Sequence, residues 1–303
     1  MKTSTLAAQA GAGADAATHI TAIGRAAVVA LHDELALAPK PGLVSFADSG
    51  SHRDMDARTF MRSLFALRTA FPGFVALGAR HAPFAALEHA GIVAEQRMLK
   101  ATNGINTHRG AVFTLGLLCA AAGRLLARGE TLQALAVRRS LVEAWGEALH
   151  ARARRPRESY ESHESHESHE SHGSRAARRF GLRSAGSEAA AGFPVLFESA
   201  WPALRDALRR GLTLQQARLD AMFAAMAVLD DTNLAHRGGL AGLRLAQRAA
   251  ADYLAAGGSA RPDALEHAQA LHRAFVARNL SPGGTADILS ACCWLQRVCA
   301  AAP

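Results

Sequence analysis

The sequence predicts an all-α fold, a single multi-helix domain whose polar loops converge on one site. Ala- and Leu-rich segments recur along the 303 residues, and 50% of the residues are hydrophobic, so the chain can bury a large core. The breaks between these segments carry Gly, Pro, Asn or Asp, as helix ends do. The alternating pattern typical of a strand is not found along the sequence. These features together indicate helices packed on helices.

The expected helices follow from these breaks. Residues 1–16 are rich in Ala, Gly and Thr, and we expect them to form a disordered tail. The all-helical domain is therefore expected to span residues 17–303. Its helices are predicted at 17–37, 57–71, 82–101, 108–128, 131–153, 195–210, 213–229, 238–256, 262–278 and 285–300.

Residues 152–179 interrupt this plan with a low-complexity segment, which reads RARRPRESYESHESHESHESHGSRAARR. Clustered imidazoles can bind a transition metal. A three-residue period drifts around a helix, however, and no Cys joins the four histidines, so we interpret the segment as an inert linker. The repeat histidines are His163, His166, His169 and His172.

The charge balance favours polyanions as ligands. The 34 basic and 26 acidic residues leave a formal net charge of +8, which attracts nucleic acid, nucleotides or acidic proteins alike. Only three of the basic residues are Lys, and Lys40 lies inside a polar stretch. A compact ammonium group is a common phosphate ligand.

The composition also indicates where the protein works. The longest apolar run, residues 111–123, is too short to span a bilayer and suits a buried core helix, so no membrane span is expected. Gly11, Gly13 and Asp15 break any apolar signal-peptide core near the N-terminus. The four cysteines form no CxxC pair, which favours reduced thiols. We therefore expect a cytoplasmic protein.

The first polar stretch that carries chemistry, residues 39–56, reads PKPGLVSFADSGSHRDMD. Its two prolines prevent helix and its glycines permit tight turns. Its cations are suited to phosphates and its carboxylates to Mg²⁺, although a helix connection capped by one of the aspartates is the open alternative. The candidate phosphate ligands are Lys40, His52 and Arg53, and the candidate Mg²⁺ ligands are Asp48, Asp54 and Asp56.

The second stretch, residues 94–113, reads AEQRMLKATNGINTHRGAVF. Glu95 and Thr102 are seven residues apart, so they share the helix face that leads into the NGINTHRG loop. A cap on the next helix is expected from Asn106 or Thr107. The free N–H groups of that helix would form an anion site together with His108 and Arg109. Simple helix capping is the alternative.

The third stretch, residues 229–239, reads LDDTNLAHRGG. Asp230 and Asp231 are predicted at a helix C-terminus, where the helix dipole disfavours negative charge and a nearby cation would compensate. Paired carboxylates beside Asn233 suit Mg²⁺ bound with phosphates. Alternatively, Arg237 supplies the compensating charge in a purely structural loop.

Two shorter segments, SEAAAGFP and SPGGTAD, place Glu188 and Asp287 at boundaries between a turn and a helix. Carboxylates at such positions are often N-caps, so each signal is weak by itself. The two segments indicate a functional site only in combination with the other motifs.

Taken together, the motifs give the chain a family resemblance. The pieces PKPGLVS, GSHRDMD, AE..M..AT.G.NTHRG, EAAAGFP, DTNL.HRGG and SPGG.AD look like those of the triphosphoribosyl-dephospho-CoA synthase family, in that family's order and spacing. The resemblance covers most of residues 30–300 and is greatest to the branch that serves malonate decarboxylase. The sequence departs from the pattern in the ESH tract, and at Ser187, where Gly is more usual before Glu188.

The resemblance implies transfer of the 5-triphosphoribosyl group of ATP to the 2′-hydroxyl of 3′-dephospho-CoA, with release of adenine. The product would be the prosthetic-group precursor of malonate decarboxylase, passed to the enzyme that modifies the acyl-carrier subunit. The family's product carries an α-ribosyl linkage, so a single inverting displacement with a carboxylate base is implied. Mg²⁺ is expected with ATP. The candidate catalytic residues are Glu34, Glu95 and Asp230, and the candidate metal ligands are Asp54, Asp230 and Asp231.

Two other classes of protein remain as alternatives. A nucleic-acid-binding protein would explain the charge, but aromatic residues make up only 6% of the chain and zinc-finger spacing is missing. A non-catalytic regulator that binds nucleotides or CoA would keep the basic groups without needing Glu34, Glu95 and Asp230. The presence of these carboxylates favours an enzyme.

Overall fold

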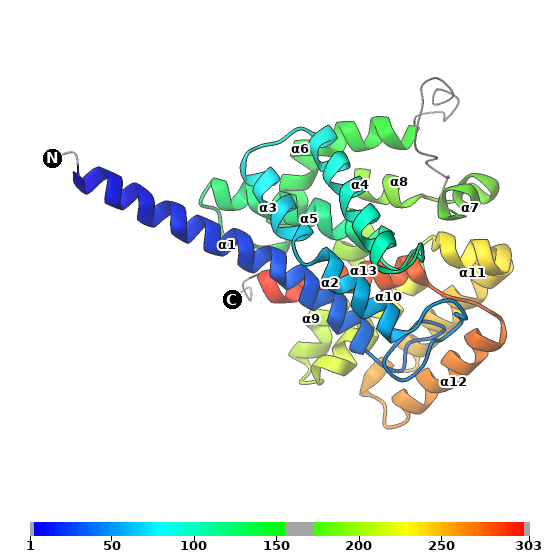
Figure 1. Ribbon diagram of the computed structural model, residues 1–303. Helices are drawn as coiled ribbons and strands as arrows, with labels where there is room; N and C mark the ends of the chain where they lie inside the picture. Colours follow the sequence, from blue (N-terminus) through cyan, green and yellow to red (C-terminus); the bar gives the residue numbers. More distant parts are fainter. Residues whose placement is uncertain (1–2, 155–171, 300–303) are drawn as a thin grey trace, which may run out of the picture.

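The computed structural model describes residues 3–154 and 172–299, and every regular element in these two ranges is a helix (Figure 1). The prediction of an all-α fold is therefore confirmed. In chain order the elements are α1 (Thr3–Ala36), α2 (Ala57–Leu67), α3 (Ala70–Ala79), α4 (Phe84–Ala101), α5 (Arg109–Ala127), α6 (Ala134–Arg154), α7 (His172–Phe180), α8 (Ala185–Ala190), the π-helix η2 (Val195–Ala200), α9 (Trp201–Arg209), α10 (Leu214–Val228), α11 (Thr232–Ala255), the 3₁₀-helix η3 (Gly258–Ala260), α12 (Ala264–Ala277) and α13 (Gly283–Val298).

Helix α5 forms the centre of the core. Almost all of its side chains from Ala111 to Gly123 are buried, and α1, α3, α4, α6 and α13 pack around it. Residues 57–79 and 109–127 are long and apolar enough to cross a membrane by composition alone. In the second of these, 72% of the most apolar window is buried inside the protein, as expected for a core helix.

Several helix boundaries differ from the predicted ones. The first helix begins at Thr3 instead of residue 17, so it runs through the segment expected to be a disordered tail. The predicted helix at 57–71 ends at Leu67, and a separate apolar helix, α3, follows it. Helix α7 forms at the end of the predicted linker, whose ESH repeats lie almost wholly outside the described residues. The division of the chain into tail, domain and linker stays a prediction.

The prediction that Asp230 and Asp231 lie at a helix C-terminus is wrong for Asp231. Helix α10 ends at Val228, and Asp231 is the N-cap of α11, accepting hydrogen bonds from the N–H groups of Asn233 and Leu234. The helix dipole therefore favours the charge of Asp231. Sequence patterns missed this because the next helix begins at Thr232, six residues before its predicted start.

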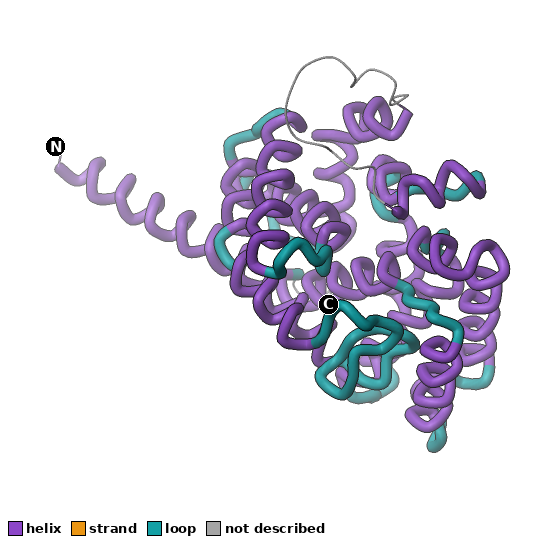
Figure 2. The backbone as a smooth tube through the Cα atoms, turned by 45° about the vertical axis from the view of Figure 1, so that its right-hand side comes forward, coloured by secondary structure: helices purple, strands orange, loops and turns teal. Residues whose placement is uncertain are grey.

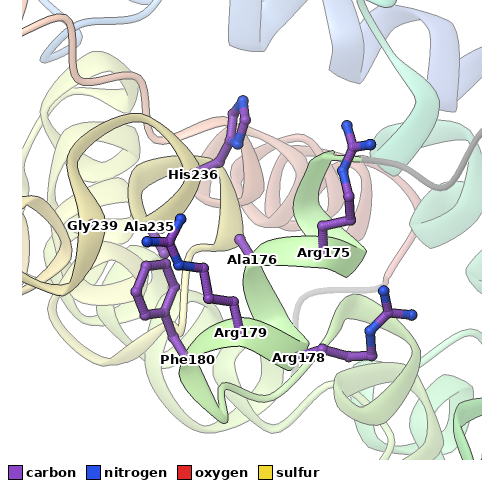
Figure 3. A pocket seen from close by; sticks show the side chains of 8 residues that line it. All are labelled: Arg175, Ala176, Arg178, Arg179, Phe180, Ala235, His236 and Gly239. Carbon is purple, nitrogen blue, oxygen red and sulfur yellow. The ribbon is translucent and has the colours of Figure 1, made fainter.

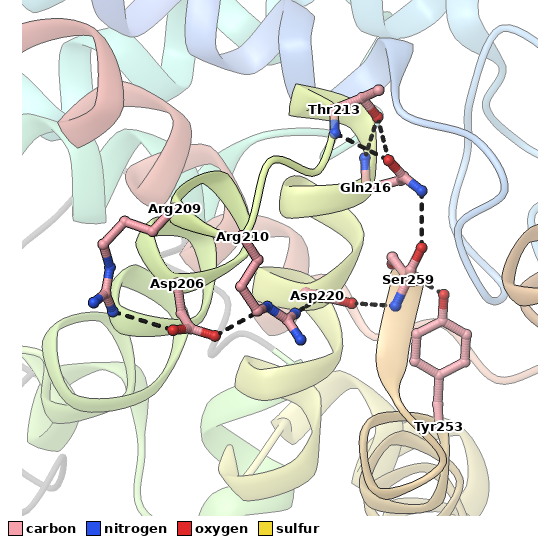
Figure 4. A network of polar contacts seen from close by, with 8 residues as sticks. All are labelled: Asp206, Arg209, Arg210, Thr213, Gln216, Asp220, Tyr253 and Ser259. Carbon is pink, nitrogen blue, oxygen red and sulfur yellow. Dashed lines mark hydrogen bonds and ion pairs between the residues drawn. The ribbon is translucent and has the colours of Figure 1, made fainter. Parts of the chain in front are cut away.

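A polar network joins α9, α10 and η3 (Figure 4). Thr213 and Gln216 form a reciprocal cap at the start of α10, and Gln216 also donates to the carbonyl of Ser259. The carboxylate of Asp220 accepts from the N–H of Ser259 at 2.8 Å and lies 3.4 Å from the guanidinium of Arg210. These contacts tie α9, α10 and η3 together.

The loops are gathered unevenly over the molecule. Figure 2 shows the largest mass of loop, in teal, at the lower end of the helical body. It includes the stretch between α1 and α2, which contains residues 39–56. All four cysteines are free, and Cys119, Cys292 and Cys293 are buried, in agreement with the expected reduced thiols.

Candidate functional site

Hydrogen bonds from side chains to backbone carbonyls join the 39–56 loop to the segment that follows α12 and to α11. The hydroxyl of Ser51 donates to the carbonyl of Leu280 at 2.6 Å, and Arg237 donates to the carbonyl of Ser51 at 2.9 Å. A side chain on Gly42 would bring its Cβ to 2.0 Å from the same Leu280 carbonyl, so only glycine allows this approach. Three motifs that are far apart in sequence therefore meet.

His52 contributes to the same junction. Its Nε2 lies 2.9 Å from the hydroxyl of Ser281, and its Nδ1 lies 3.1 Å from the guanidinium of Arg237. Burial, with the charge of Arg237, lowers the pKa of His52. A neutral His52 ring that accepts a hydrogen bond from Arg237 at Nδ1 donates one from Nε2 to Ser281. His52 therefore joins the first, third and fourth motifs.

Lys40 lies in the protein interior, 1% exposed, next to a buried acid. Its ammonium group is 2.5 Å from the carboxylate of Glu34 and 2.6 Å from the carbonyl of the same residue. Burial lowers the pKa of Lys40 and raises that of Glu34, while their mutual attraction opposes both shifts. The two predicted residues are thus brought together as one ion pair.

His272 supports this arrangement, although sequence reasoning did not select it. Its Nδ1 lies 2.7 Å from the Lys40 carbonyl, and its Nε2 lies 3.2 Å from the carboxylate of Asp48. It is 6% exposed and lies on α12 among apolar positions. A single histidine on such a helix gives no pattern by which the sequence could mark it.

His108 precedes α5 as its N-cap residue and is 3% exposed. Its Nδ1 lies 2.6 Å from the hydroxyl of Ser63, while its Nε2 has no hydrogen-bond partner in the described structure. Burial, together with the charge of Lys40, lowers the pKa of His108 to about 3. The imidazole is therefore neutral at physiological pH and can offer a ligand a hydrogen bond but no positive charge.

The burial of His108 predicts how the stability of the folded protein depends on pH. The unfolded chain binds a proton on His108 below its usual pKa of 6.5, whereas the folded protein does so only near pH 3. The stability that His108 contributes is therefore fully present above pH 6.5 and falls as the pH drops, by about 1.4 kcal/mol per pH unit. Urea unfolding at pH 7, 6 and 5 should show this extra loss relative to His108→Gln. Parallel stability curves for the two proteins would contradict it.

Other side chains of the second motif form hydrogen bonds mainly with groups of the same motif. Thr102 is buried, and its hydroxyl lies 2.9 Å from the carbonyl of Met98 and 2.5 Å from that of Ile105. The side chain of Asn106 accepts from the N–H of Arg109 at 3.1 Å, but the N-cap residue of α5 is His108 instead of the predicted Asn106 or Thr107.

Two of the predicted functional groups in this motif pair with each other, and a third is left without a partner. Arg109 forms an ion pair with Glu95, and both side chains are about one-third exposed. The hydroxyl of Thr107 is buried and has no hydrogen-bond partner in the described structure. The loop therefore presents a partly exposed ion pair and an unsatisfied hydroxyl.

Asp287 reaches from the start of α13 to the start of α5. The N–H of Ala111 donates to its carboxylate, and a Cβ on Gly110 would lie 1.9 Å from that carboxylate. Burial and the nearby charges of Asp231 and Glu34 hold the pKa of Asp287 well above its usual value. In the described structure Asp287 has no basic side chain within ion-pair distance. The sequence had given this residue only a weak signal.

Asp231 joins the third and fourth motifs. Besides its cap on α11, its carboxylate accepts from the N–H of Thr285 at 2.8 Å and from the hydroxyl of Thr285 at 3.0 Å. The side chain of Asn233 lies against Gly283, where an added Cβ would be 2.6 Å from its amide nitrogen. These hydrogen bonds favour the structural alternative for Asp231 over metal ligation.

Asp230 and Glu188 lie on either side of Arg183. The guanidinium of Arg183 is 3.6 Å from the carboxylate of Asp230 and 3.7 Å from that of Glu188. Glu188 is 4% exposed, and one of its oxygens accepts from the N–H of Val195 while the other has no hydrogen-bond partner in the described structure. Burial raises the pKa of Glu188. Arg183, which sequence reasoning missed, lies four residues before the start of the SEAAAGFP motif.

Arg53 and Asp54 lie apart from these buried groups. Both are exposed and line an open surface pocket of about 600 Å³ with the start of α2. The Asp54 carboxylate is 3.7 Å from His52. The structure therefore places this part of the first motif at the rim of the loop cluster.

The carboxylates can be compared with what Mg²⁺ requires. No group of three acidic, His or Cys side chains within residues 3–154 and 172–299 is arranged as a metal site. Mg²⁺ bound with phosphates needs only one or two carboxylates, because phosphates and water fill the other positions. Asp230 fits this need, since its carboxylate is partly exposed and has a single basic neighbour, Arg183.

Comparisons with known proteins agree with the arrangement of the motifs. Residues 20–302 match the model of a family described as ATP:dephospho-CoA triphosphoribosyl transferase. A probable 2-(5''-triphosphoribosyl)-3'-dephosphocoenzyme-A synthase of Acinetobacter calcoaceticus is 34% identical over 285 residues, covering 94% of this chain and 93% of the relative. The 2-(5''-triphosphoribosyl)-3'-dephosphocoenzyme-A synthase of Pectobacterium atrosepticum is 41% identical over 272 residues, covering 88% and 85%. No solved structure matches the chain.

Proposed function

The chain belongs to the ATP:dephospho-CoA triphosphoribosyl transferase family and is a transferase, and we propose that it moves the 5-triphosphoribosyl group of ATP to the 2′-hydroxyl of 3′-dephospho-CoA with release of adenine. The observation that carries this proposal is the convergence of the motifs. Residues 39–56, 108–111, 229–231 and 279–287 meet around two buried acids, Glu34 and Asp231, and Asp287 lies near both of them.

The site offers cations and neutral donors for the phosphates. Arg109 lies at the N-terminus of α5, where the helix dipole favours an anion, and the N–H groups of Arg109 and Ala111 there donate to Asn106 and Asp287. The side chains of Thr107 and His108 each have a buried polar atom without a partner in the described structure, which a ligand would satisfy. We assign phosphate and ribose binding to these residues, together with Lys40, His52, Arg53, Thr102, Asn106, Asn233 and Glu188.

A carboxylate base completes the proposed reaction. It would take the proton of the 2′-hydroxyl as the oxygen attacks the anomeric carbon from the face opposite adenine. Glu34, Glu95 and Asp230 are candidates, but each lies within ion-pair distance of a cation: Lys40, Arg109 and Arg183, respectively. Asp287 joins them and is the strongest, because its neighbours are two acids and a backbone N–H group.

Mg²⁺ is proposed to accompany ATP, and it would neutralise charge on the triphosphate. Asp230 is the carboxylate best placed to hold it, and Asp54 is a further candidate. Asp231 is the least suited of the three, because its oxygens already accept hydrogen bonds from Asn233, Leu234 and Thr285. We further propose that the protein works in the cytoplasm and that its product serves malonate decarboxylase, passing first to the enzyme that modifies the acyl-carrier subunit. The support for the malonate decarboxylase branch is the order of the sequence motifs and the residues that they contain.

The proposed reaction predicts that adenine release requires both substrates. ATP alone offers only water in place of the 2′-hydroxyl, so purified protein with ATP and Mg²⁺ should release little adenine until dephospho-CoA is added. Chromatography of the reaction mixture measures this directly. Equal release without dephospho-CoA would identify a nucleosidase and contradict the proposal.

A further inference from the structure

Three side chains from different motifs form a chain of hydrogen bonds that ends just before α13. Arg237 lies 3.1 Å from Nδ1 of His52, and Nε2 of His52 lies 2.9 Å from the hydroxyl of Ser281. His236 and Gly239, which lie close to Arg237 on α11, line a groove between α7 and α11 (Figure 3). Arg237 extends instead to the loop that carries His52.

The chemistry of the three groups fixes the direction of each hydrogen bond. A guanidinium group can only donate, so Nδ1 of His52 is the acceptor and carries no hydrogen. Burial and the charge of Arg237 lower the pKa of His52, which keeps the ring neutral. The ring hydrogen is therefore on Nε2 and is donated to the oxygen of Ser281. The carboxylate of Asp54 is farther from Nδ1, at 3.7 Å, and is mostly exposed.

Ser281 is left with a hydroxyl hydrogen to donate. Within the part of the chain that the structure describes, this hydrogen has no acceptor. Ser281 is 3% exposed, yet its hydrogen bond with His52 is only partly buried, so a ligand can approach the pair. A buried hydroxyl that is held as a donor costs free energy unless it has an acceptor, and an oxygen atom of a ligand would supply one.

The surroundings of Ser281 favour a neutral acceptor. Ser281 lies four residues before Thr285, whose N–H and hydroxyl donate to the Asp231 carboxylate. A Cβ on Gly284 would lie 3.3 Å from that carboxylate, and Asp287 is close enough to feel its charge. These acids would repel the negative charge of a phosphate. A sugar hydroxyl is neutral, accepts from a serine and can donate to a carboxylate.

We propose that the hydroxyl of Ser281 donates a hydrogen bond to a ribose hydroxyl of one of the two substrates, and that Arg237 is a positioning residue that acts through His52. This assignment rests on the proposed function. Charge and spacing did not mark Ser281 in the sequence, because its role depends on a histidine 229 positions away in the chain. ATP and dephospho-CoA both carry ribose hydroxyls, and analogues that lack single hydroxyls distinguish the two sources.

The test measures by calorimetry how tightly native protein and Ser281→Ala bind each substrate alone. Loss of one neutral hydrogen bond should weaken the binding of one substrate about three- to tenfold. The analogue of that substrate without the contacted hydroxyl should bind both proteins equally, because no contact with Ser281 remains to be lost. The analogues are 2′-deoxy-ATP, 3′-deoxy-ATP and the corresponding forms of dephospho-CoA.

Ser290→Ala is the matched control. Ser290 is a buried serine on α13 whose hydroxyl donates to the carbonyl of Ala286 at 3.0 Å, so all affinities should stay unchanged in this variant. Weaker binding of ATP alone in Ser281→Ala assigns the contact to the ribose of ATP, and weaker binding of dephospho-CoA alone assigns it to the other ribose. Unchanged affinities, weaker binding of both substrates, or a loss that persists with every deoxy analogue overturns the assignment.

The positioning role of Arg237 has its own measurements. NMR of the ring nitrogens of His52 in native protein should show a hydrogen on Nε2 and none on Nδ1, and a hydrogen on Nδ1 would overturn the role of Arg237. In Arg237→Met the donor to Nδ1 is lost, so the preference for the substrate over its deoxy analogue should shrink, as it does in Ser281→Ala. An unchanged preference would also overturn that role, since a purely structural loss weakens the binding of both compounds alike.

Binding and turnover together separate this assignment from the proposed reaction. If Ser281→Ala shows the loss specific to one ribose hydroxyl but native protein releases no adenine with both substrates, the Ser281 contact stands and the proposed reaction fails. If native protein releases adenine and Ser281→Ala binds every compound with native affinity, the reaction stands and the Ser281 contact is wrong.

Discussion

Replacing Asp287 by Asn should lower kcat by about 10²–10⁴-fold, the usual contribution of a general base, while ATP binding is largely kept. The amide preserves the shape of the side chain and can still accept from the N–H of Ala111. Glu95→Gln and Asp230→Asn should have smaller effects on kcat, because each carboxylate is ion-paired with an arginine. Single-turnover rates with saturating substrates measure the chemical step.

The raised pKa of Asp287 gives this prediction a second measurement. A base that must be ionised produces an acid limb in the pH profile of kcat/KM, here at a higher pH than an ordinary aspartate would give. The limb should disappear in Asp287→Asn. If this variant keeps a near-normal kcat, or if a ribosyl-enzyme adduct is trapped during turnover, the single displacement with Asp287 as base is wrong.

A matched glycine pair provides a control. In Gly110→Ala the new methyl group would lie 1.9 Å from the Asp287 carboxylate and must displace it, so activity should fall without loss of the carboxylate itself. In Gly91→Ala the methyl group meets no atom within 4 Å, so activity should be unchanged. Equal activity of the two variants would mean that the position of the carboxylate does not matter.

Lys40→Met should destabilise the protein by about 3–5 kcal/mol, because it leaves the buried carboxylate of Glu34 without its partner. Replacing both members, as Lys40→Met with Glu34→Leu, should recover much of that loss, since well-packed apolar residues need no ion pair. Urea unfolding measures both effects. The matched control is Lys100→Met at an exposed helix position, which should change the stability by less than about 0.5 kcal/mol.

The double variant also separates stability from catalysis. If Lys40 contacts phosphate during the reaction, the stable double variant should still bind ATP more weakly than native protein. A Lys40→Met protein as stable as native would contradict the buried ion pair that the structure places between α1 and the 39–56 loop.

The all-α fold was predictable because apolar segments and their breaks mark helices strongly. Helix α3 was missed because only Arg68 and Thr69, two residues that can continue a helix, separate it from α2. The role of Asp231 was misplaced because a cap at the start of one helix and a charge at the end of another look alike in sequence. Only the bonds to Thr285 and to the first turn of α11 distinguish them.

The site was predictable as a set of motifs but not as a set of pairings. Charge and spacing selected Lys40, Glu95 and Arg109, and the family resemblance added Glu34, yet no sequence pattern indicates that these four residues form two separate ion pairs. Arg183 and His272 were missed because single residues outside motifs carry no periodic signal. Asp287 was undervalued because its importance depends on Gly110, which lies 177 positions earlier in the chain and leaves space for the carboxylate.

The most direct test of the central claim, that the converging loops form one site for triphosphoribosyl transfer, is to identify the products by mass spectrometry and NMR. Native protein with ATP, Mg²⁺ and dephospho-CoA should form adenine and triphosphoribosyl-dephospho-CoA in equal amounts, with an α linkage at the new anomeric bond. Adenine accompanied by free ribose triphosphate, or a product with the β linkage of ATP, would contradict a direct inverting transfer at this site.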